Sequence, residues 1–241
     1  IVLAGAWVVK QKSIAWIALP ILHVLAIGLP VLWVTYLAIR RLPSGSPQRA
    51  WGVFAVGLIL SPVILLFIEA VLLVISVVVA MLWMMTQPAL VGEFQALMQT
   101  MITGVPDPQA FLPLLELLLN RPETIIGVML FGAVLIPLLE ELFKPIGVWL
   151  MAGNKLSQAA GFVAGDISGA GYALFETLAF ATSGSEWTMM VVLRVGTAVV
   201  HITTTALTGW ALVSAWRKRA YLQLGATYLL AAAIHGLWNA I

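Results

Sequence analysis

The sequence predicts an all-α fold, a polytopic transmembrane helical bundle of about six spanning helices. Of its 241 residues, 62% are hydrophobic and only 9% are charged, whereas soluble domains carry about 25% charged residues. Apolar runs long enough to cross a bilayer also recur along the chain. A water-soluble fold cannot bury that much apolar surface, so we expect the lipid bilayer to be the solvent for most of the chain.

The first half of the chain is predicted to hold two spans and an acidic segment. Residues 14–39 form an apolar run, and 42–49 form a short loop by composition. We expect 51–85 to be one long helix because no polar turn interrupts it; the alternative is a break near Pro62. Residues 87–123 form an extramembrane segment that we expect to lie along the membrane interface. Its acids and its helically spaced apolar residues include Glu93, Asp107, Glu116, Glu123, Phe111, Leu114, Leu115, Leu118 and Leu119.

The second half of the chain is predicted to form a core of four spans. We therefore divide the chain into an N-terminal region, 1–123, and this core, 124–241. Small residues in the second span of the core favour close contact with a neighbouring helix. The four spans are 124–152, 159–182, 187–216 and 221–241, and the glycines of the second are Gly161, Gly165, Gly169 and Gly171.

Loop charges predict the orientation of the bundle. Six spans place three basic loops on one side, which the positive-inside rule assigns to the cytoplasm of a multi-pass protein of the cell membrane. Lys10 and Lys12 fall on the opposite side, which is a mild conflict. The basic loop residues are Arg40, Arg41, Arg49, Lys155, Arg217, Lys218 and Arg219.

Composition also excludes several classes of function. The chain has no cysteine, which excludes a disulfide framework, a thiolate metal site and a cysteine nucleophile. Its few Lys and Arg residues sit at helix ends, so we expect no nucleic-acid partner. The chain starts at Ile1 instead of Met and stops inside an apolar run, so we expect it to be part of a longer protein.

Ionisable residues inside the predicted spans must be stabilised by partners, because they are costly to place in lipid. A charge at the bilayer centre costs about 2.5–3.5 kcal/mol on insertion scales. Unpaired exposure to lipid is therefore excluded for the set as a whole, and its members must meet each other, a metal or water. The candidates in the core are Glu140, Glu141, Lys144, Asp166, Glu176, Arg194, His201 and His235.

Two adjacent carboxylates and one amine form the first candidate cluster. Lys144 follows Glu140 by four residues and Glu141 by three, so all share one helix face. Pro137 and Pro145 bracket them and predict a broken helix, which is tolerated at depth only beside a polar cavity. The cluster favours a general base that activates water, tuned by the lysine. The alternative is an ion pair that only joins helices, but the second carboxylate argues against it.

Histidines on later spans form the second candidate set. His201 and His235 lie in the middle of their spans, Glu176 lies on the glycine-rich span, and Asn239 follows His235 by one turn. Two histidines and a glutamate are a ligand set of catalytic zinc that leaves one position open for water. Taken singly, a buried histidine is more often a hydrogen-bonded packing residue. Any metal here would be held between helices, because no single helix offers both histidines.

Three other polar residues in the spans are interpreted separately. We expect His23 to pack or to form a hydrogen bond, with a haem ligand as the alternative. Glu69 is interpreted as a proton relay or a helix-pairing residue. Asp166 lies near the cytoplasmic end of its span and is expected to be hydrated.

These motifs resemble one known family. Glu140-Glu141-Leu142-Phe143-Lys144 resembles the EExxK motif of the PrsW family of intramembrane proteases, within the superfamily of CAAX proteases and bacteriocin-processing relatives. Phe175-Glu176 resembles its second motif and His201 its third. The closing HxxxN motif is matched by His235 and Asn239. The resemblance covers 124–241, which it identifies as a protease-like core.

The resemblance implies an endopeptidase that cleaves a membrane-associated protein or peptide. Glu140 or Glu141 would activate water, with Lys144 in the catalytic group and Asn239 assisting. Glu176, His201 and His235 would hold a metal, with Zn²⁺ as the candidate, or polarise the scissile carbonyl.

Two other hypotheses remain open at the level of sequence. The chain could be a non-catalytic subunit or scaffold of a larger membrane complex, as its motif-free first half suggests. It could also be a proton-coupled carrier, given Glu69, Asp166 and the broken helix, but no inverted repeat is visible.

Overall fold

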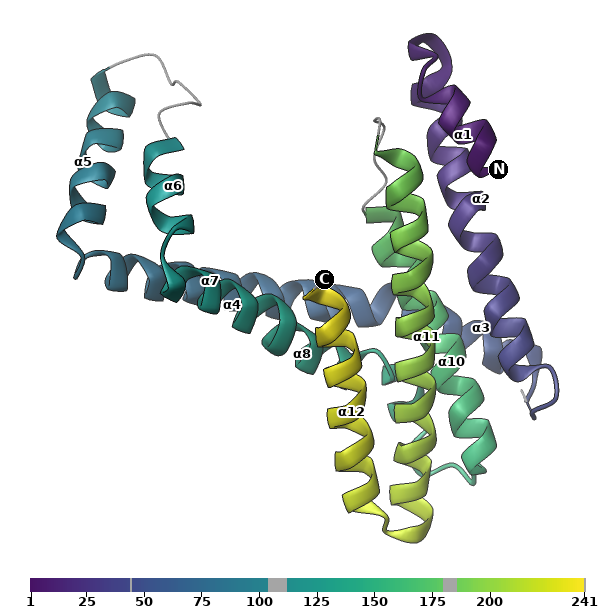
Figure 1. The fold of residues 1–241 in the computed structure, drawn as a ribbon. Coiled ribbons are helices and arrows are strands. Elements are labelled where there is room, and N and C mark those ends of the chain that lie inside the picture. The colour runs from purple at the N-terminus through teal and green to yellow at the C-terminus, as the bar shows by residue number, and fades with distance from the viewer. Residues whose placement is uncertain (44, 104–111, 180–185, 241) are drawn as a thin grey trace. The chain divides into compact units, whose positions relative to one another are not determined.

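The computed structural model describes residues 1–43, 45–103, 112–179 and 186–240. Throughout these residues the chain forms helices and connecting turns and no β-strand, which confirms the predicted all-α class (Figure 1). Asp107 and Phe111 of the acidic segment lie outside the described residues, as do residues 180–182 of a predicted span. The chain divides into two compact units, one formed by Ile1–Leu65 with Ala133–Ile241 and the other by Leu66–Gly132.

The N-terminal helices of the first unit are α1 (Val2–Val8), which was not predicted, and α2 (Lys12–Ile39). They are followed by α3 (Pro47–Ala55), the π-helix η1 (Val56–Leu60) and α4 (Ser61–Met84). The last three run on without a turn, so the prediction of one long helix is confirmed. The π-helix ends at Leu60, two residues before Pro62, which lacks an amide proton for the carbonyl four residues earlier. A wider turn accommodates that missing hydrogen bond.

The same device recurs in the helix that carries the two adjacent glutamates. The π-helix η3 (Leu130–Leu135) separates α7 (Pro122–Met129) from α8 (Ile136–Phe143) and lies before Pro137. The chain then turns at Lys144 and Pro145 into the short helix α9 (Ile146–Trp149). The predicted break at Pro145 is confirmed, and it places Lys144 at the C-cap of α8.

Three long helices complete the first unit: α10 (Gln158–Ala179), α11 (Trp187–Lys218) and α12 (Tyr221–Asn239). Glycines let α10 lie directly against α11, since a Cβ atom at Gly165 would overlap the carbonyl oxygen of Thr205. On another side of α10, a Cβ atom at Gly171 would lie 2.5 Å from the carbonyl oxygen of Phe54. The predicted close contact through small residues is therefore confirmed.

The basic loops meet at one end of the first unit, as six spans require. Arg217 donates a hydrogen bond to the Leu156 carbonyl oxygen at 3.0 Å, and Lys218 donates one to Gln158 at 2.7 Å. Arg40 and Arg41 line a groove at the same end, together with Trp210 of α11. Assignment of this end to the cytoplasm stays a prediction.

The second unit contains the acidic segment, in which α5 (Pro88–Thr103) and α6 (Leu112–Leu119) lie side by side (Figure 1). The helix predicted from the apolar spacing is thus confirmed over Leu112–Leu119. Arg121 donates a hydrogen bond to Gln87 Oε1 at 3.1 Å and lies over the Trp83 ring. These contacts join the two ends of the α5–α6 hairpin.

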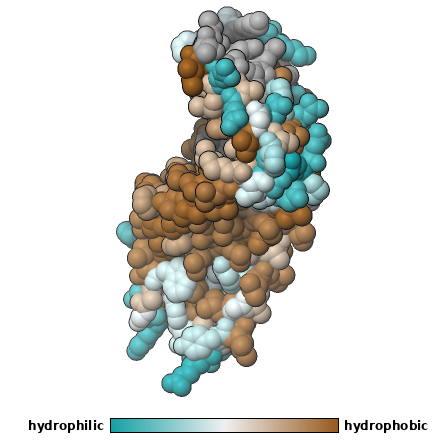
Figure 2. All heavy atoms as spheres, turned by 90° about the vertical axis from the view of Figure 1, so that its left-hand side faces the viewer, coloured by the Kyte–Doolittle hydropathy of each residue, from teal (hydrophilic) through white to brown (hydrophobic). Residues whose placement is uncertain are grey.

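Surface composition identifies the chain as a membrane protein. Four helical segments in the described residues are long and apolar enough to cross a bilayer: Ser13–Ile39, Pro47–Met84, Pro122–Trp149 and Trp187–Lys218. Their exposed side chains are large and hydrophobic, as shown by Phe67 at 72% and Val192 at 63% exposure. Figure 2 shows a broad area of hydrophobic side chains on the face turned to the viewer. Crossing by α10 and α12, the remaining two of the six predicted spans, stays a prediction.

Candidate active site

The adjacent glutamates and their lysine form a buried ion cluster at the end of α8. Lys144 Nζ lies 2.8 Å from Glu140 Oε2 and 2.9 Å from Glu141 Oε1. The side chains of Lys144 and Glu141 are fully buried, and that of Glu140 is 9% exposed. The spacing of these three residues places their side chains on one face of α8, within reach of one another. Because buried charges are costly unless they are paired, the ammonium of Lys144 stabilises both carboxylates in this site.

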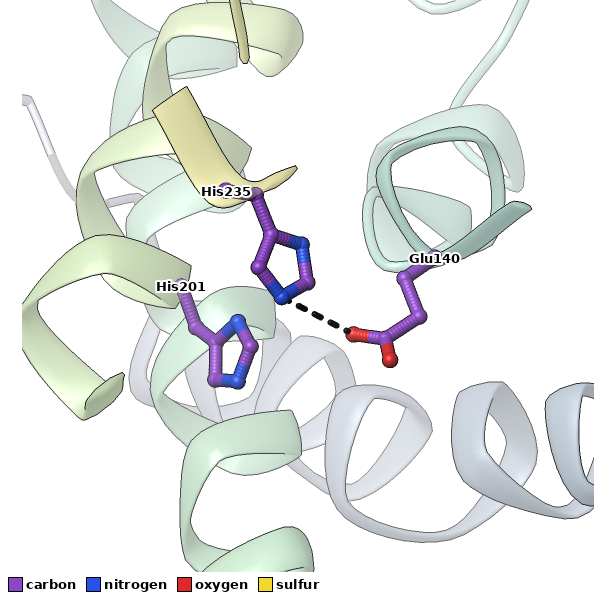
Figure 3. Close-up of side chains that lie close together, drawn as sticks. All are labelled: Glu140, His201 and His235. Carbon is purple, nitrogen blue, oxygen red and sulfur yellow. Dashed lines mark ion pairs between the residues drawn. The ribbon is translucent and has the colours of Figure 1, made fainter. Parts of the chain in front are cut away.

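Histidines from two other helices complete the cluster. Lys144 Nζ lies 2.7 Å from His201 Nδ1 on α11 and 3.1 Å from His235 Nδ1 on α12. His235 Nδ1 also lies 3.0 Å from Glu141 Oε1, and its Nε2 lies 3.8 Å from Glu140 Oε2 (Figure 3). The two imidazole rings pack edge to face, with centroids 4.9 Å apart. Residues from α8, α11 and α12 therefore share one site.

Lys144 cannot donate to all of its neighbours at once. An ammonium has three protons, and four side-chain atoms lie within 3.1 Å of Lys144 Nζ. When His201 Nδ1 accepts a hydrogen bond from Lys144, the proton on His201 Nε2 is available for Glu176. Glu141 Oε2 has no hydrogen-bond partner among the described residues, so the cluster has acceptor capacity to spare.

Glu176 binds the far side of His201. Its Oε2 accepts a short hydrogen bond from His201 Nε2, and its Oε1 accepts one from Arg194 Nη1 at 2.9 Å. The Glu176 and Arg194 side chains are 23% and 16% exposed, more than the rest of the site. This carboxylate fixes the orientation of the imidazole, as second-shell carboxylates do for catalytic and metal-binding histidines.

Two residues on α10 belong to the site although the sequence analysis gave them no role. The Tyr172 ring packs edge to face on His201, with centroids 5.2 Å apart, and lies 5.0 Å from Lys144 Nζ. Ser168 Oγ donates a hydrogen bond to the Lys144 carbonyl oxygen at 2.7 Å. The available signal was the spacing of four residues from Ser168 to Tyr172 and from Tyr172 to Glu176, which places all three on one helix face.

Three of these residues could hold a metal ion. Glu140, His201 and His235 each offer one ligand atom, and these atoms lie within 4.8 Å of one another. Two imidazoles and a carboxylate suit zinc. The zinc set expected from the sequence was Glu176, His201 and His235. The structure places Glu140 beside both histidines and Glu176 on the outer nitrogen of His201.

Comparison with known proteins identifies the family. The model of the PrsW family of intramembrane metalloproteases matches residues 45–241, most of the chain. The chain belongs to this family. The match begins well before 124, so it includes α3 and α4 as well as the helices that carry the motifs of the PrsW family. No curated protein and no solved structure matches the chain.

Asn239, His23, Asp166 and Glu69 are the other polar residues that the sequence of this PrsW-family chain singled out. Asn239 lies one turn beyond His235 at the end of α12, and its side chain is exposed. His23 is buried and its Nε2 lies 3.2 Å from the Thr177 carbonyl oxygen, which confirms the predicted hydrogen bond. Asp166 is 1% exposed, so the expectation that it is hydrated was wrong. Glu69 lies on α4 in the second unit, and its role stays a prediction.

Proposed function

We propose that this chain is an intramembrane endopeptidase in which Glu140 activates a water molecule for attack on a peptide bond. The observation that carries the proposal is the meeting of two carboxylates, one ammonium and two imidazoles from α8, α11 and α12 in a buried site. Structural ion pairs need only equal numbers of charges, and this cluster has an excess carboxylate, with Glu140 Oε2 3.8 Å from His235 Nε2. Groups with such environments are those that enzymes use as bases.

The two glutamates have different roles in this proposal. Glu141 is fully buried and accepts hydrogen bonds from both Lys144 and His235, so it positions those groups. Glu140 is more exposed and its Oε2 faces His235 Nε2. Glu140 therefore accepts a proton from the attacking water as the oxygen bonds to the carbonyl carbon. It then gives this proton to the leaving amine nitrogen.

The surrounding residues orient this reaction. Arg194 and Glu176 hold the His201 ring through its Nε2, and the Tyr172 ring packs against it. Asn239 is assigned an assisting contact with the substrate backbone, because its exposed amide lies one turn from His235.

Glu140, His201 and His235 are the residues that would hold a zinc ion. A carboxylate bound to zinc cannot also act as the base, so in a zinc-bound form Glu141 would take the proton of the water in place of Glu140. When bound, zinc would polarise the water or the scissile carbonyl as a Lewis acid. The donor types fit this metal. Glu141 and Glu176, which hydrogen-bond the two imidazoles, match the carboxylates that typically orient zinc-binding histidines.

The substrate proposed for this site is a membrane-associated protein or peptide. The side chains of Glu141, Lys144, His201 and His235 are at most 2% exposed, so a peptide reaches the site only if neighbouring helices separate. The more exposed Glu140 and Glu176 mark the accessible sides of the cluster. We propose that the protease core is 124–241 and that the protein spans the cell membrane several times.

Cleavage can be tested without a known substrate. Membranes from cells that produce the wild-type chain, Glu140→Gln or Glu93→Gln are compared for new protein N-termini by mass spectrometry. Glu93 is an exposed acid on α5 of the second unit and serves as the matched control. We expect a set of N-termini shared by wild type and Glu93→Gln and lost in Glu140→Gln. If Glu140→Gln yields the same N-termini as wild type, the chain is not this protease, and the hypothesis of a non-catalytic subunit gains support.

A further inference from the structure

The Lys144 ammonium occupies the centre of the group of residues that could bind a metal. Four side-chain atoms from three helices surround Nζ: Glu140 Oε2 at 2.8 Å, Glu141 Oε1 at 2.9 Å, His201 Nδ1 at 2.7 Å and His235 Nδ1 at 3.1 Å. The side chain is fully buried. With two carboxylate oxygens and two imidazole nitrogens around one positive charge, this position acts as a cation site that the chain fills itself.

The same donor atoms can surround either cation. Tetrahedral zinc with bonds of about 2.0–2.2 Å brings its ligand atoms to about 3.4 Å from one another. An ammonium with hydrogen bonds of about 2.9 Å spreads four acceptors to about 4.7 Å. The three candidate ligand atoms lie within 4.8 Å of one another, a limit that both geometries meet. Zinc at this position would need the atoms around Nζ, now at hydrogen-bond distance, to move closer together.

From this geometry we propose that the Lys144 ammonium and a zinc ion are alternative occupants of one site, so that zinc binds only when the Lys144 side chain leaves the cluster. The inference rests on the proposed function in taking Glu140, His201 and His235 as the zinc ligands. It assigns Lys144 a role that the motif alone does not reveal, control of metal loading.

Charge balance indicates that the Lys144 ammonium and a zinc ion cannot occupy the site together. Glu140 and Glu141 carry two negative charges, and Lys144 leaves the buried group with one negative charge in excess. A zinc ion in place of the ammonium would balance both carboxylates. Both cations together would add a third positive charge at close range inside a buried site, where such repulsion is poorly screened.

The structure also shows how Lys144 could leave without unfolding α8. Its carbonyl oxygen accepts a hydrogen bond from Ser168 Oγ, and its amide donates to the Glu140 carbonyl oxygen at 2.8 Å. The backbone is thus fixed on both sides, while the four-carbon side chain can rotate. Rotation of this side chain would free His201 Nδ1 and let the glutamates contract around a metal.

Zinc binding to purified protein tests the proposal. Wild type, Lys144→Met and the control Lys155→Met, which alters an exposed loop lysine, are titrated with zinc chloride in detergent after chelator treatment. We expect Lys144→Met to bind one zinc per chain about 100-fold more tightly than wild type, since the metal no longer displaces charge-assisted hydrogen bonds. Lys155→Met should match wild type. Adding His235→Leu to Lys144→Met should remove the tight binding. Equal affinity in wild type and Lys144→Met, or no zinc binding to either, overturns the proposal.

A second measurement on wild-type protein covers the case in which Lys144→Met does not fold. Lysine acetylation by a small reagent is quantified by mass spectrometry with and without saturating zinc. We expect Lys144 to be protected without zinc and to become several-fold more reactive with it, while Lys155 is unchanged. An unchanged Lys144 at zinc saturation overturns the proposal. Neither measurement requires cleavage, so failure here leaves the Glu140→Gln comparison intact.

Discussion

Replacing Gly165 by Ala tests whether α10 and α11 approach as closely as the structure shows. An added Cβ atom would overlap the Thr205 carbonyl oxygen and lie 2.9 Å from Ala206 Cα and 3.0 Å from the Thr205 carbonyl carbon. All three neighbours are backbone atoms, so no side-chain rotation relieves the overlap. The two helices must move apart, and these helices carry Glu176 and His201.

The expected magnitude follows from two opposing effects. Overpacking of a rigid contact costs about 3 kcal/mol at the upper end of measured cases. Alanine regains about 1 kcal/mol of helix propensity relative to glycine. The net loss for Gly165→Ala is then about 2 kcal/mol. For a chain of this length this loss lowers the melting temperature by about 4–8 °C.

Gly225→Ala is the matched control, because a Cβ atom at Gly225 on α12 would meet nothing within 4 Å. It gains helix propensity without overlap, so it should raise stability by about 0.5–1 kcal/mol. Thermal unfolding of both variants in the same detergent is followed by circular dichroism. We expect Gly165→Ala to lower the melting temperature and Gly225→Ala to raise it. A Gly165→Ala variant as stable as Gly225→Ala would show that the helices are not in direct backbone contact.

Two further predictions concern the support of the site. Arg194→Gln should lower the cleavage rate about tenfold by releasing Glu176 from one of its partners, yet cost less than about 1 kcal/mol of stability because the pair is partly exposed. Cleavage kinetics and chemical unfolding measure both, and an unchanged rate would remove Arg194 from the site. Ser61→Ala should cost about 1 kcal/mol, because its buried hydroxyl donates to the Phe143 carbonyl oxygen at 3.2 Å. Denaturant unfolding in detergent measures this loss, and a neutral result would contradict the hydrogen bond.

Local sequence patterns predicted the structural features that depend on a single helix. The apolar runs predicted membrane helices, and four segments meet the length and hydropathy of a span. The spacing of Glu140, Glu141 and Lys144 predicted a shared face, and Pro145 predicted the break that follows. These features follow from helix geometry and from the missing amide proton of proline. Both effects act between residues that are close in the sequence, so the sequence is enough to predict them.

Features that depend on packing between helices could not be predicted from the sequence. Counting from the loop placed Asp166 near water, but α2, α3 and α11 pack around α10, and Asp166 is buried. Depth along a span does not tell which side a helix turns to its neighbours. For the same reason the pairing of Glu140, not Glu176, with both histidines and the packing of Tyr172 on His201 could not be read from the motifs. The extra helix α1 was missed because it is short.

The most direct test of the account is a double-mutant cycle between α8 and α12, because it asks whether buried acids and imidazoles from distant parts of the chain meet. The stabilities of wild type, Glu141→Leu, His235→Leu and the double variant are measured by unfolding in detergent. Their side chains lie 3.0 Å apart, and a hydrogen bond to a charged group predicts a coupling energy of about 1.5–3 kcal/mol. Additive effects, within about 0.5 kcal/mol, would mean that the two side chains do not meet and would contradict the account.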